Sequence, residues 1–138
     1  MRFMLMIIPK GYENAPPGTV PVDTEAVAKM MKYNEDLQRA GVLLALDGLH
    51  PPSMGARVSF AGGKPVVEDG PFAEAKEVIG GYWLIDVRSR DEAIEWAKRC
   101  PGADNEVLEV RQVHEFSDYP PEVQAVAESY PEMQGRRG

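Results

Sequence analysis

The segment Glu68-Asp69-Gly70-Pro71-Phe72-Ala73-Glu74-Ala75-Lys76-Glu77 organises the rest of the chain. It holds five ionisable side chains in ten residues, contains a Gly-Pro pair, and runs into the apolar stretch Gly81–Ile85. A solvated charged loop rarely lies so tightly between two strand-like segments. We therefore interpret the segment as a polar turn fixed at the mouth of a cleft, with Asp69 as its focus.

A β-hairpin is expected immediately before this segment. Residues 56–61 and 64–68 are strand-like, and Gly62-Gly63 between them suits a two-residue primed turn because glycine accepts positive φ at both positions. This register places Asp69 opposite Ala56 and Arg57 opposite Glu68. The simple account of Arg57 is therefore a cross-strand ion pair, and the alternative is a role in ligand binding.

The remaining elements follow from hydrophobic periodicity and helix-capping signals. Strands are predicted over residues 3–8, 42–46, 79–87 and 106–114, and helices over 25–40 and from Ser89 to Cys100. Ser89 and Glu92 form a capping box for the second helix. The inward side chains are predicted to be Val27, Met30, Met31, Asn34 and Leu37 on the first helix and Ala93, Trp96, Ala97 and Cys100 on the second.

The order of these elements predicts an α+β fold. Without the hairpin, the chain reads βαββαβ, which is the ferredoxin-like pattern with two helices on one face of the sheet. Strands this apolar need cover on the other face too, so we expect a homodimer whose sheets pack face to face. The domain is expected to span residues 1–116, and residues 117–138 to form a C-terminal arm that lies on a partner subunit or frays.

Composition excludes several classes of function. The 138 residues carry a net charge of -7, which argues against nucleic acid and anionic membranes as partners. One cysteine and two histidines argue against a disulfide and against a metal site. No phosphate loop or dinucleotide fingerprint is present, so no cofactor is expected. The apolar run at residues 3–8 is too short for a signal peptide or a membrane span, and a cytoplasmic protein is expected.

Asp69 and His50 are the candidate catalytic residues. His50 follows a predicted strand and precedes Pro51-Pro52, and the hairpin brings Asp69 to the same end of the sheet. A carboxylate that orients an imidazole is a standard acid–base arrangement. The alternatives are an Asx turn, in which Asp69 accepts from the Phe72 N–H, and a surface histidine.

Other polar side chains are candidates for ligand binding. Glu109 and Arg111 share one face of an otherwise apolar strand, where they either form an edge-strand ion pair or line a polar pocket enclosed by the dimer. Tyr82 could supply a hydroxyl to that pocket. Lys76 belongs either to a solvated turn or to an anion-binding site. The loop Lys10–Val22 is either a flap over a site or a disordered excursion.

Several motifs resemble those of the YciI-related family, in its DGPF-motif branch. They are Lys32–Glu35, Gly48–Pro51, Asp69–Glu77, Glu95–Pro101 and Glu109–Val113. The resemblance covers residues 1–116 and implies a ferredoxin-like dimeric α+β barrel. It further implies a cofactor-independent enzyme with an Asp and a His in a cleft, which can be placed only on Asp69 and His50 here.

Two hypotheses for function follow, together with a purely structural alternative. In the first, the protein is a lyase or isomerase that acts on a small polar or aromatic molecule; Asp69 orients His50, and Arg111 and Lys76 hold an anionic group. In the second, it is a non-catalytic ligand-binding or regulatory protein. Some DGPF genes neighbour extracytoplasmic-function sigma factors, so the resemblance makes such a factor the candidate partner. In the third, the motif only stabilises the dimer.

Overall fold

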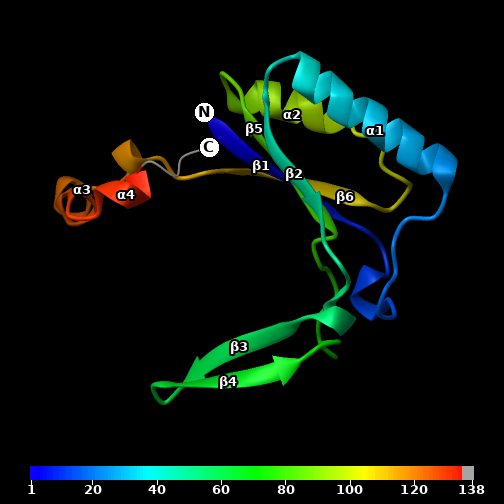
Figure 1. The fold of residues 1–138 in the computed structure, drawn as a ribbon, viewed down its shortest axis with the longest axis horizontal. Coiled ribbons are helices and arrows are strands. Elements are labelled where there is room, and N and C mark those ends of the chain that lie inside the picture. Colours follow the sequence, from blue (N-terminus) through cyan, green and yellow to red (C-terminus); the bar gives the residue numbers. More distant parts are fainter. Residues whose placement is uncertain (135–138) are drawn as a thin grey trace.

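The computed structural model describes residues 1–134. The main domain contains six strands and two long helices in the predicted order (Figure 1). The strands are β1 (Arg2–Ile8), β2 (Leu43–Gly48), β3 (Ala56–Ala61), β4 (Lys64–Asp69), β5 (Gly81–Asp86) and β6 (Val107–Gln112). The helices are α1 (Thr24–Arg39), α2 (Arg90–Lys98), α3 (Pro121–Glu128) and α4 (Pro131–Gln134), with 3-10 turns η1 (Tyr12–Asn14), η2 (Pro52–Met54) and η3 (Phe116–Asp118).

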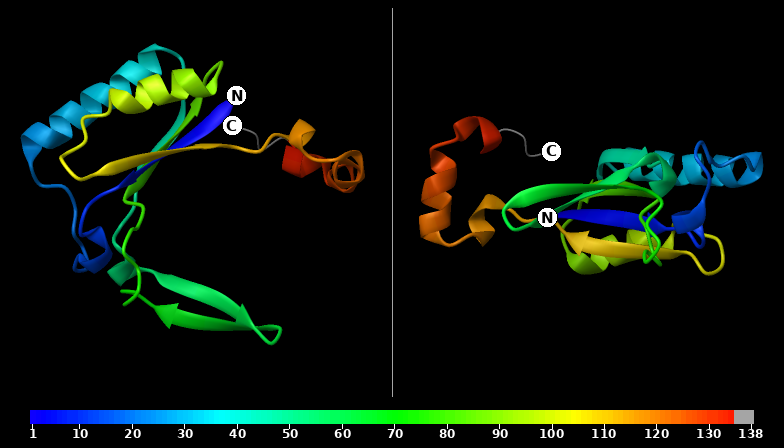
Figure 2. Two further views of the ribbon diagram at one scale, coloured as in Figure 1. Left: turned by 180° about the vertical axis from the view of Figure 1, so that it is seen from behind. Right: turned by 90° about the horizontal axis from the view of Figure 1, so that it is seen from below.

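The main sheet confirms the ferredoxin-like prediction. Its strand order is β2-β5-β1-β6, every neighbouring pair is antiparallel, and α1 and α2 lie on the same face (Figures 1 and 2). The four strands form an open sheet within one chain rather than a closed barrel. The face without helices is called the open sheet face below.

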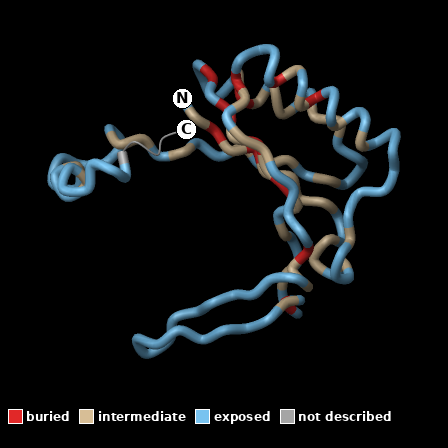
Figure 3. The backbone as a smooth tube through the Cα atoms, in the orientation of Figure 1, coloured by how far each residue is buried: buried red, intermediate tan, exposed pale blue. Residues whose placement is uncertain are grey.

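The hydrophobic core lies between the helices and the sheet (Figure 3). Phe3, Leu5 and Ile85 come from the strands, Leu37 from α1 and Ala93 from α2, and each is at most 2% exposed. The prediction for α2 is confirmed, because Trp96, Ala97 and Cys100 pack against this core. The sequence could specify this half of the molecule because both helices carry a clear apolar stripe.

The prediction for α1 needs one correction. Met31 is 62% exposed, and Tyr33 takes an inward position that was not predicted. The ring of Tyr33 meets Trp83 edge to face at 5.5 Å, and its hydroxyl donates to the backbone oxygen of Trp96. Asn34 accepts a 2.7 Å hydrogen bond from the indole N–H of Trp83, so this polar residue has a structural role in the core.

The predicted cap of α2 is present with one change, and a side chain also caps α1. Asp23 accepts hydrogen bonds from the backbone N–H groups of Glu25 and Ala26, and Ser89 accepts one from Glu92. The Glu92 carboxylate then accepts from the N–H of Arg88, one residue before the cap. Both helix starts are therefore fixed by side chains, as the sequence indicates.

The hairpin β3–β4 has the predicted register, with Ala56 opposite Asp69 and Ala61 opposite Lys64. Gly62 and Gly63 both have positive φ, as the primed turn requires. The predicted ion pair between Arg57 and Glu68 is wrong: no such pair occurs within residues 1–134. The Arg57 guanidinium instead lies 4.1 Å from the centroid of the Phe72 ring. The cation–π contact with the buried ring is favoured because an exposed ion pair contributes little to stability.

The chain leaves the sheet at β6 and continues into η3, α3 and α4. This segment extends away from the sheet, and so does the β3–β4 hairpin, on the side opposite α1 and α2 (Figures 1 and 2). An ion pair of 2.8 Å between Arg2 and Glu115 fixes the base of the segment. The C-terminal arm is thus helical at residues 121–128 and 131–134. Among residues 1–134, no helix has the length and apolar character that crossing a bilayer requires.

Candidate functional site

The turn that follows β4 is packed tightly against the loop that follows β2. The Gly70 N–H donates to the Gly55 carbonyl at 2.9 Å, and a Cβ on Gly70 would lie 1.8 Å from the Pro52 carbonyl oxygen. Only glycine therefore fits at position 70 without moving the backbone. The Gly70–Pro71 peptide bond is cis. This packing joins the turn that carries Asp69 to the loop that carries His50.

Two residues beside this junction are buried in the structure. Phe72 is 8% exposed and Pro51 is less than 2% exposed. Arg57 covers the outer face of the Phe72 ring. The polar segment 68–77 is therefore anchored by Phe72, an apolar residue within it. This contact explains why a charged turn keeps a fixed position.

The loop Lys10–Val22 packs on the same junction. The Tyr12 hydroxyl donates to the Leu49 carbonyl at 2.6 Å, and the Ser53 hydroxyl donates to the Ala15 carbonyl at 2.8 Å. Burial raises the pKa of Tyr12, which keeps its hydroxyl in the donating form. The loop thus lies against η2 beside His50, in the position expected of a flap.

Asp69 and His50 reach the same region without pairing. Both are exposed, and within residues 1–134 neither side chain makes a hydrogen bond or an ion pair. The Asx-turn interpretation of Asp69 is not observed either, since the described part of the chain holds no bond from the Phe72 N–H to its carboxylate. The single chain therefore presents the two groups unpaired at the end of the sheet.

The open sheet face carries three of the other candidate residues, Tyr82, Glu109 and Arg111. The strand register aligns Asp47, Tyr82, Met6 and Glu109 in one row across all four strands. The Tyr82 hydroxyl donates to the Asp47 carboxylate at 2.9 Å, and this hydrogen bond raises the pKa of Tyr82. The apolar Met6 lies between this pair and the acidic Glu109.

Arg111 and Glu109 form an ion pair at 3.3 Å on the edge strand β6, which was one of the two predicted arrangements. Both side chains are substantially exposed, at 71% and 45%. Lys76 is also exposed, and no ion pair with it is found among residues 1–134. Arg111 is thus already paired on the single chain, although its side chain stays accessible.

Sequence reasoning missed two acidic residues. The predicted strand 42–46 stops one residue before Asp47, which lies within β2 and is the partner of Tyr82. Glu13 lies in η1 and has one carboxylate oxygen, Oε2, that is buried without a hydrogen-bond partner in the described chain. Glu13 lies in a Gly- and Pro-rich loop, which has no periodic hydrophobic pattern from which its burial could be predicted. The alternation of side chains along a strand, in contrast, could have placed Asp47 opposite Tyr82.

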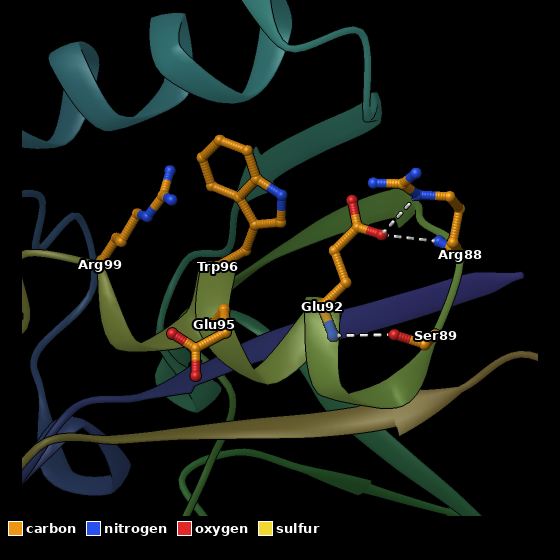
Figure 4. Close-up of a pocket in the computed structure, with 6 residues that line it drawn as sticks. All are labelled: Arg88, Ser89, Glu92, Glu95, Trp96 and Arg99. Atoms are coloured by element: carbon orange, nitrogen blue, oxygen red, sulfur yellow. Dashed lines mark hydrogen bonds and ion pairs between the residues drawn. The ribbon is translucent and has the colours of Figure 1, made fainter.

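Two cavities lie elsewhere, one along α2 and one between the end of α2 and β6. An open groove of about 430 Å³ is lined by Arg88, Ser89, Glu92, Glu95, Trp96 and Arg99 (Figure 4). Its charges are already occupied, since Arg88 pairs with Glu92 and Arg99 stacks on Trp96. A smaller cavity of about 200 Å³ includes Cys100, and burial raises the pKa of that thiol to about 11. Neither cavity contains a predicted site residue.

No group of three or more His, Cys, Asp or Glu side chains is arranged to hold a metal ion in the part of the chain that the structure describes.

Comparison with known proteins agrees with this fold. The sequence model of the YCII-related domain matches residues 1–117. An uncharacterised protein of Rhizobium meliloti (strain 1021) is 40% identical over 81 residues, which cover 59% of this chain and 60% of that protein. The chain thus aligns with less than two thirds of that relative's length.

Proposed function

Since this chain belongs to the YCII-related family, we propose that it is a cofactor-independent cytoplasmic enzyme of the DGPF branch. Asp69 and His50 perform acid–base chemistry on a small polar or aromatic molecule, in a lyase or isomerase reaction. The observation that carries the proposal is the packing of Gly70 against Pro52 and Gly55, which holds the turn of Asp69 against the loop of His50. A junction this tight is expected where two reacting groups need fixed positions.

The proposed roles follow from the chemistry of the side chains. An imidazole can remove a proton and return it to another atom near neutral pH, and a carboxylate beside it stabilises the cation that forms. Substrate binding would bring the two groups into hydrogen-bond distance, which is common for catalytic groups that are loosely arranged without substrate. Arg111 and Lys76 are the proposed partners of an anionic substrate group, with Tyr82, Arg57 and Glu109 lining the site.

A second copy of the chain is part of this proposal. The open sheet face exposes Leu44 at 37% and Val107 at 49%, and Met4, Met6 and Leu84 are only half-buried there. A homodimer that packs two such faces together would cover these side chains and complete a barrel. It would also enclose the pairs Tyr82–Asp47 and Arg111–Glu109, which supports a polar pocket at the interface.

A non-catalytic regulatory role is the second candidate. It is favoured by the apolar residues of the C-terminal arm, where Val126 and Tyr130 are each 63% exposed and Met133 is 55% exposed. Exposed apolar residues of this kind on two short helices and the link between them fit a protein partner such as a sigma factor. In this case the same site would bind a ligand without converting it.

Thermal-shift screening against small carboxylic acids and phenols tests the proposal. A ligand of the proposed site should raise the unfolding temperature of the wild type and not that of Asp69→Asn or His50→Gln. Glu68→Gln is the matched control, because Glu68 is an exposed carboxylate next to Asp69, on the other side of the same strand.

Catalysis is then tested on the compounds that bind. Incubation in D₂O, followed by proton NMR, should show exchange or conversion with the wild type only. Binding without any turnover would contradict the enzyme and favour the regulatory role. Binding that survives both substitutions would contradict the assignment of the site.

A further inference from the structure

The β3–β4 hairpin has two different faces. Residues directly opposite in the register share a face, so Val58, Phe60, Pro65 and Val67 lie together on one side. We call these four residues the apolar hairpin face. The other side carries Arg57, Ser59, Lys64, Val66 and Glu68, and is mostly polar.

Residues 1–134 of the same chain leave the apolar hairpin face uncovered. Val58 is 52% exposed, Val67 66% and Phe60 80%, and all twelve residues of the two strands are exposed (Figure 3). An isolated two-stranded hairpin is marginally stable in water and needs another surface to pack on. At the base, Arg57 turns the polar side toward Phe72 of its own chain, so the apolar side points away from that contact.

The direction in which the hairpin projects indicates what kind of surface could cover its apolar face. The hairpin and the C-terminal arm leave the sheet on the side of the open sheet face, so that the ribbon has the shape of a C (Figures 1 and 2). The open sheet face is apolar as well, with Met4, Met6 and Leu84 half-buried at its centre. One occupant lying against this face would also meet the hairpin.

We infer that this occupant is a second copy of the chain and that the apolar hairpin face packs on it. A twofold dimer requires a self-complementary surface, and this chain has both a projecting apolar hairpin and an apolar face for a partner to fill. The inference rests on the proposed dimer and adds a contact to it. Asp69 shares the hairpin side of Val58 and Val67, so the partner subunit forms one wall of the candidate site.

Sedimentation velocity and hydrogen exchange test this contact. The double variant Val58→Ser/Phe60→Ser should raise the dissociation constant of the dimer by at least about tenfold, because each side chain loses the burial it gains at the interface. Val66→Ser is the matched control, since Val66 is also 52% exposed but lies on the polar side, and it should change the constant by less than about twofold. Amides of residues 56–69 should be protected above the dissociation constant and exchange freely below it.

Met6→Lys separates this inference from the dimer itself. If Met6→Lys gives monomers while Val58→Ser/Phe60→Ser leaves the dimer unchanged, the hairpin contact is wrong and the dimer through the open sheet face stands. If hairpin amides are equally protected at every concentration, the cover is not a second copy and the inference is overturned. A wild type that is monomeric at all concentrations overturns both. Far-UV circular dichroism confirms that each variant is folded.

Discussion

The two faces of the main sheet are built on different principles. Toward α1 and α2, strand side chains such as Leu5 and Ile85 are completely buried, and the polar Asn34 among them has its hydrogen bond to Trp83. On the open sheet face, apolar residues alternate with Asp47, Tyr82, Glu109 and Arg111, and all remain accessible. One chain completes the first face and leaves the second for a partner or ligand.

The largest expected effect tests the completed face. Leu37→Ala removes a side chain with 0% exposure and should lower the free energy of unfolding by about 2–5 kcal/mol, through lost burial and the cavity left behind. Leu84→Ala on the open sheet face should lower the free energy of unfolding much less than Leu37→Ala does at low protein concentration. At high concentration, where the dimer forms, its effect should be larger. Urea denaturation at two concentrations measures both. Equal, concentration-independent losses would contradict the contrast between the faces.

The next effect concerns the junction between the two loops. Gly70→Ala places a methyl group against the Pro52 carbonyl and should lower stability by about 1–3 kcal/mol. Gly55→Ala is the control, because its Cβ would meet the nearest atom at an ordinary 3.6 Å and its φ is -121°. The loss from Gly70→Ala should be accompanied by loss of ligand binding. If Gly70→Ala is as stable as Gly55→Ala, the junction is not rigid.

The hydrogen bond inside the core should have an effect of similar size on stability. Asn34→Ala leaves the indole N–H of a residue that is 5% exposed without its partner, at a cost of about 1–3 kcal/mol. When Asn34→Ala is made in the Trp83→Phe background, it should lower the free energy of unfolding distinctly less, because phenylalanine has no N–H group that needs a hydrogen-bond partner. A double-mutant cycle by thermal denaturation measures this coupling, and additive effects would show that the bond contributes nothing.

The smallest effect is a pH dependence. Burial raises the pKa of Cys100 from its ordinary 9.0 to about 11, with Glu106 adding to the shift. The folded chain therefore holds this proton more tightly than the unfolded chain. The stabilisation that results from the raised pKa of Cys100 is fully present below pH 9 and is lost as the pH rises to 11. Cys100→Ala should flatten the stability profile over that interval, measured by urea denaturation, while Tyr33, whose pKa burial also raises, keeps a decline at higher pH.

The elements of the fold could be predicted because each carries a local signal. Asp23 and Ser89 cap their helices, and Gly62-Gly63 sets the hairpin register. Predictions that depended on distant partners were less accurate. Arg57 stacks on Phe72 rather than pairing with Glu68, and Tyr33 rather than Met31 turns inward, because Trp83 and Trp96 offer it contacts that helical periodicity cannot reveal.

The candidate site was harder to predict for the same reason. Its position follows from the hairpin register and from Gly70, which are local features. The pairing of Tyr82 with Asp47 and the buried oxygen of Glu13 depend on how strand and flap meet in space. The spacing of residues in the sequence does not contain that information.

The central claim is that the open sheet face is covered by a second copy of this chain. Sedimentation equilibrium of the wild type beside Leu84→Arg tests it most directly, because an arginine at the centre of that face would be buried without a partner. The account predicts a mass of twice 15.2 kDa for the wild type and 15.2 kDa for the folded variant. A wild-type monomer, or a Leu84→Arg variant that remains dimeric, would contradict it.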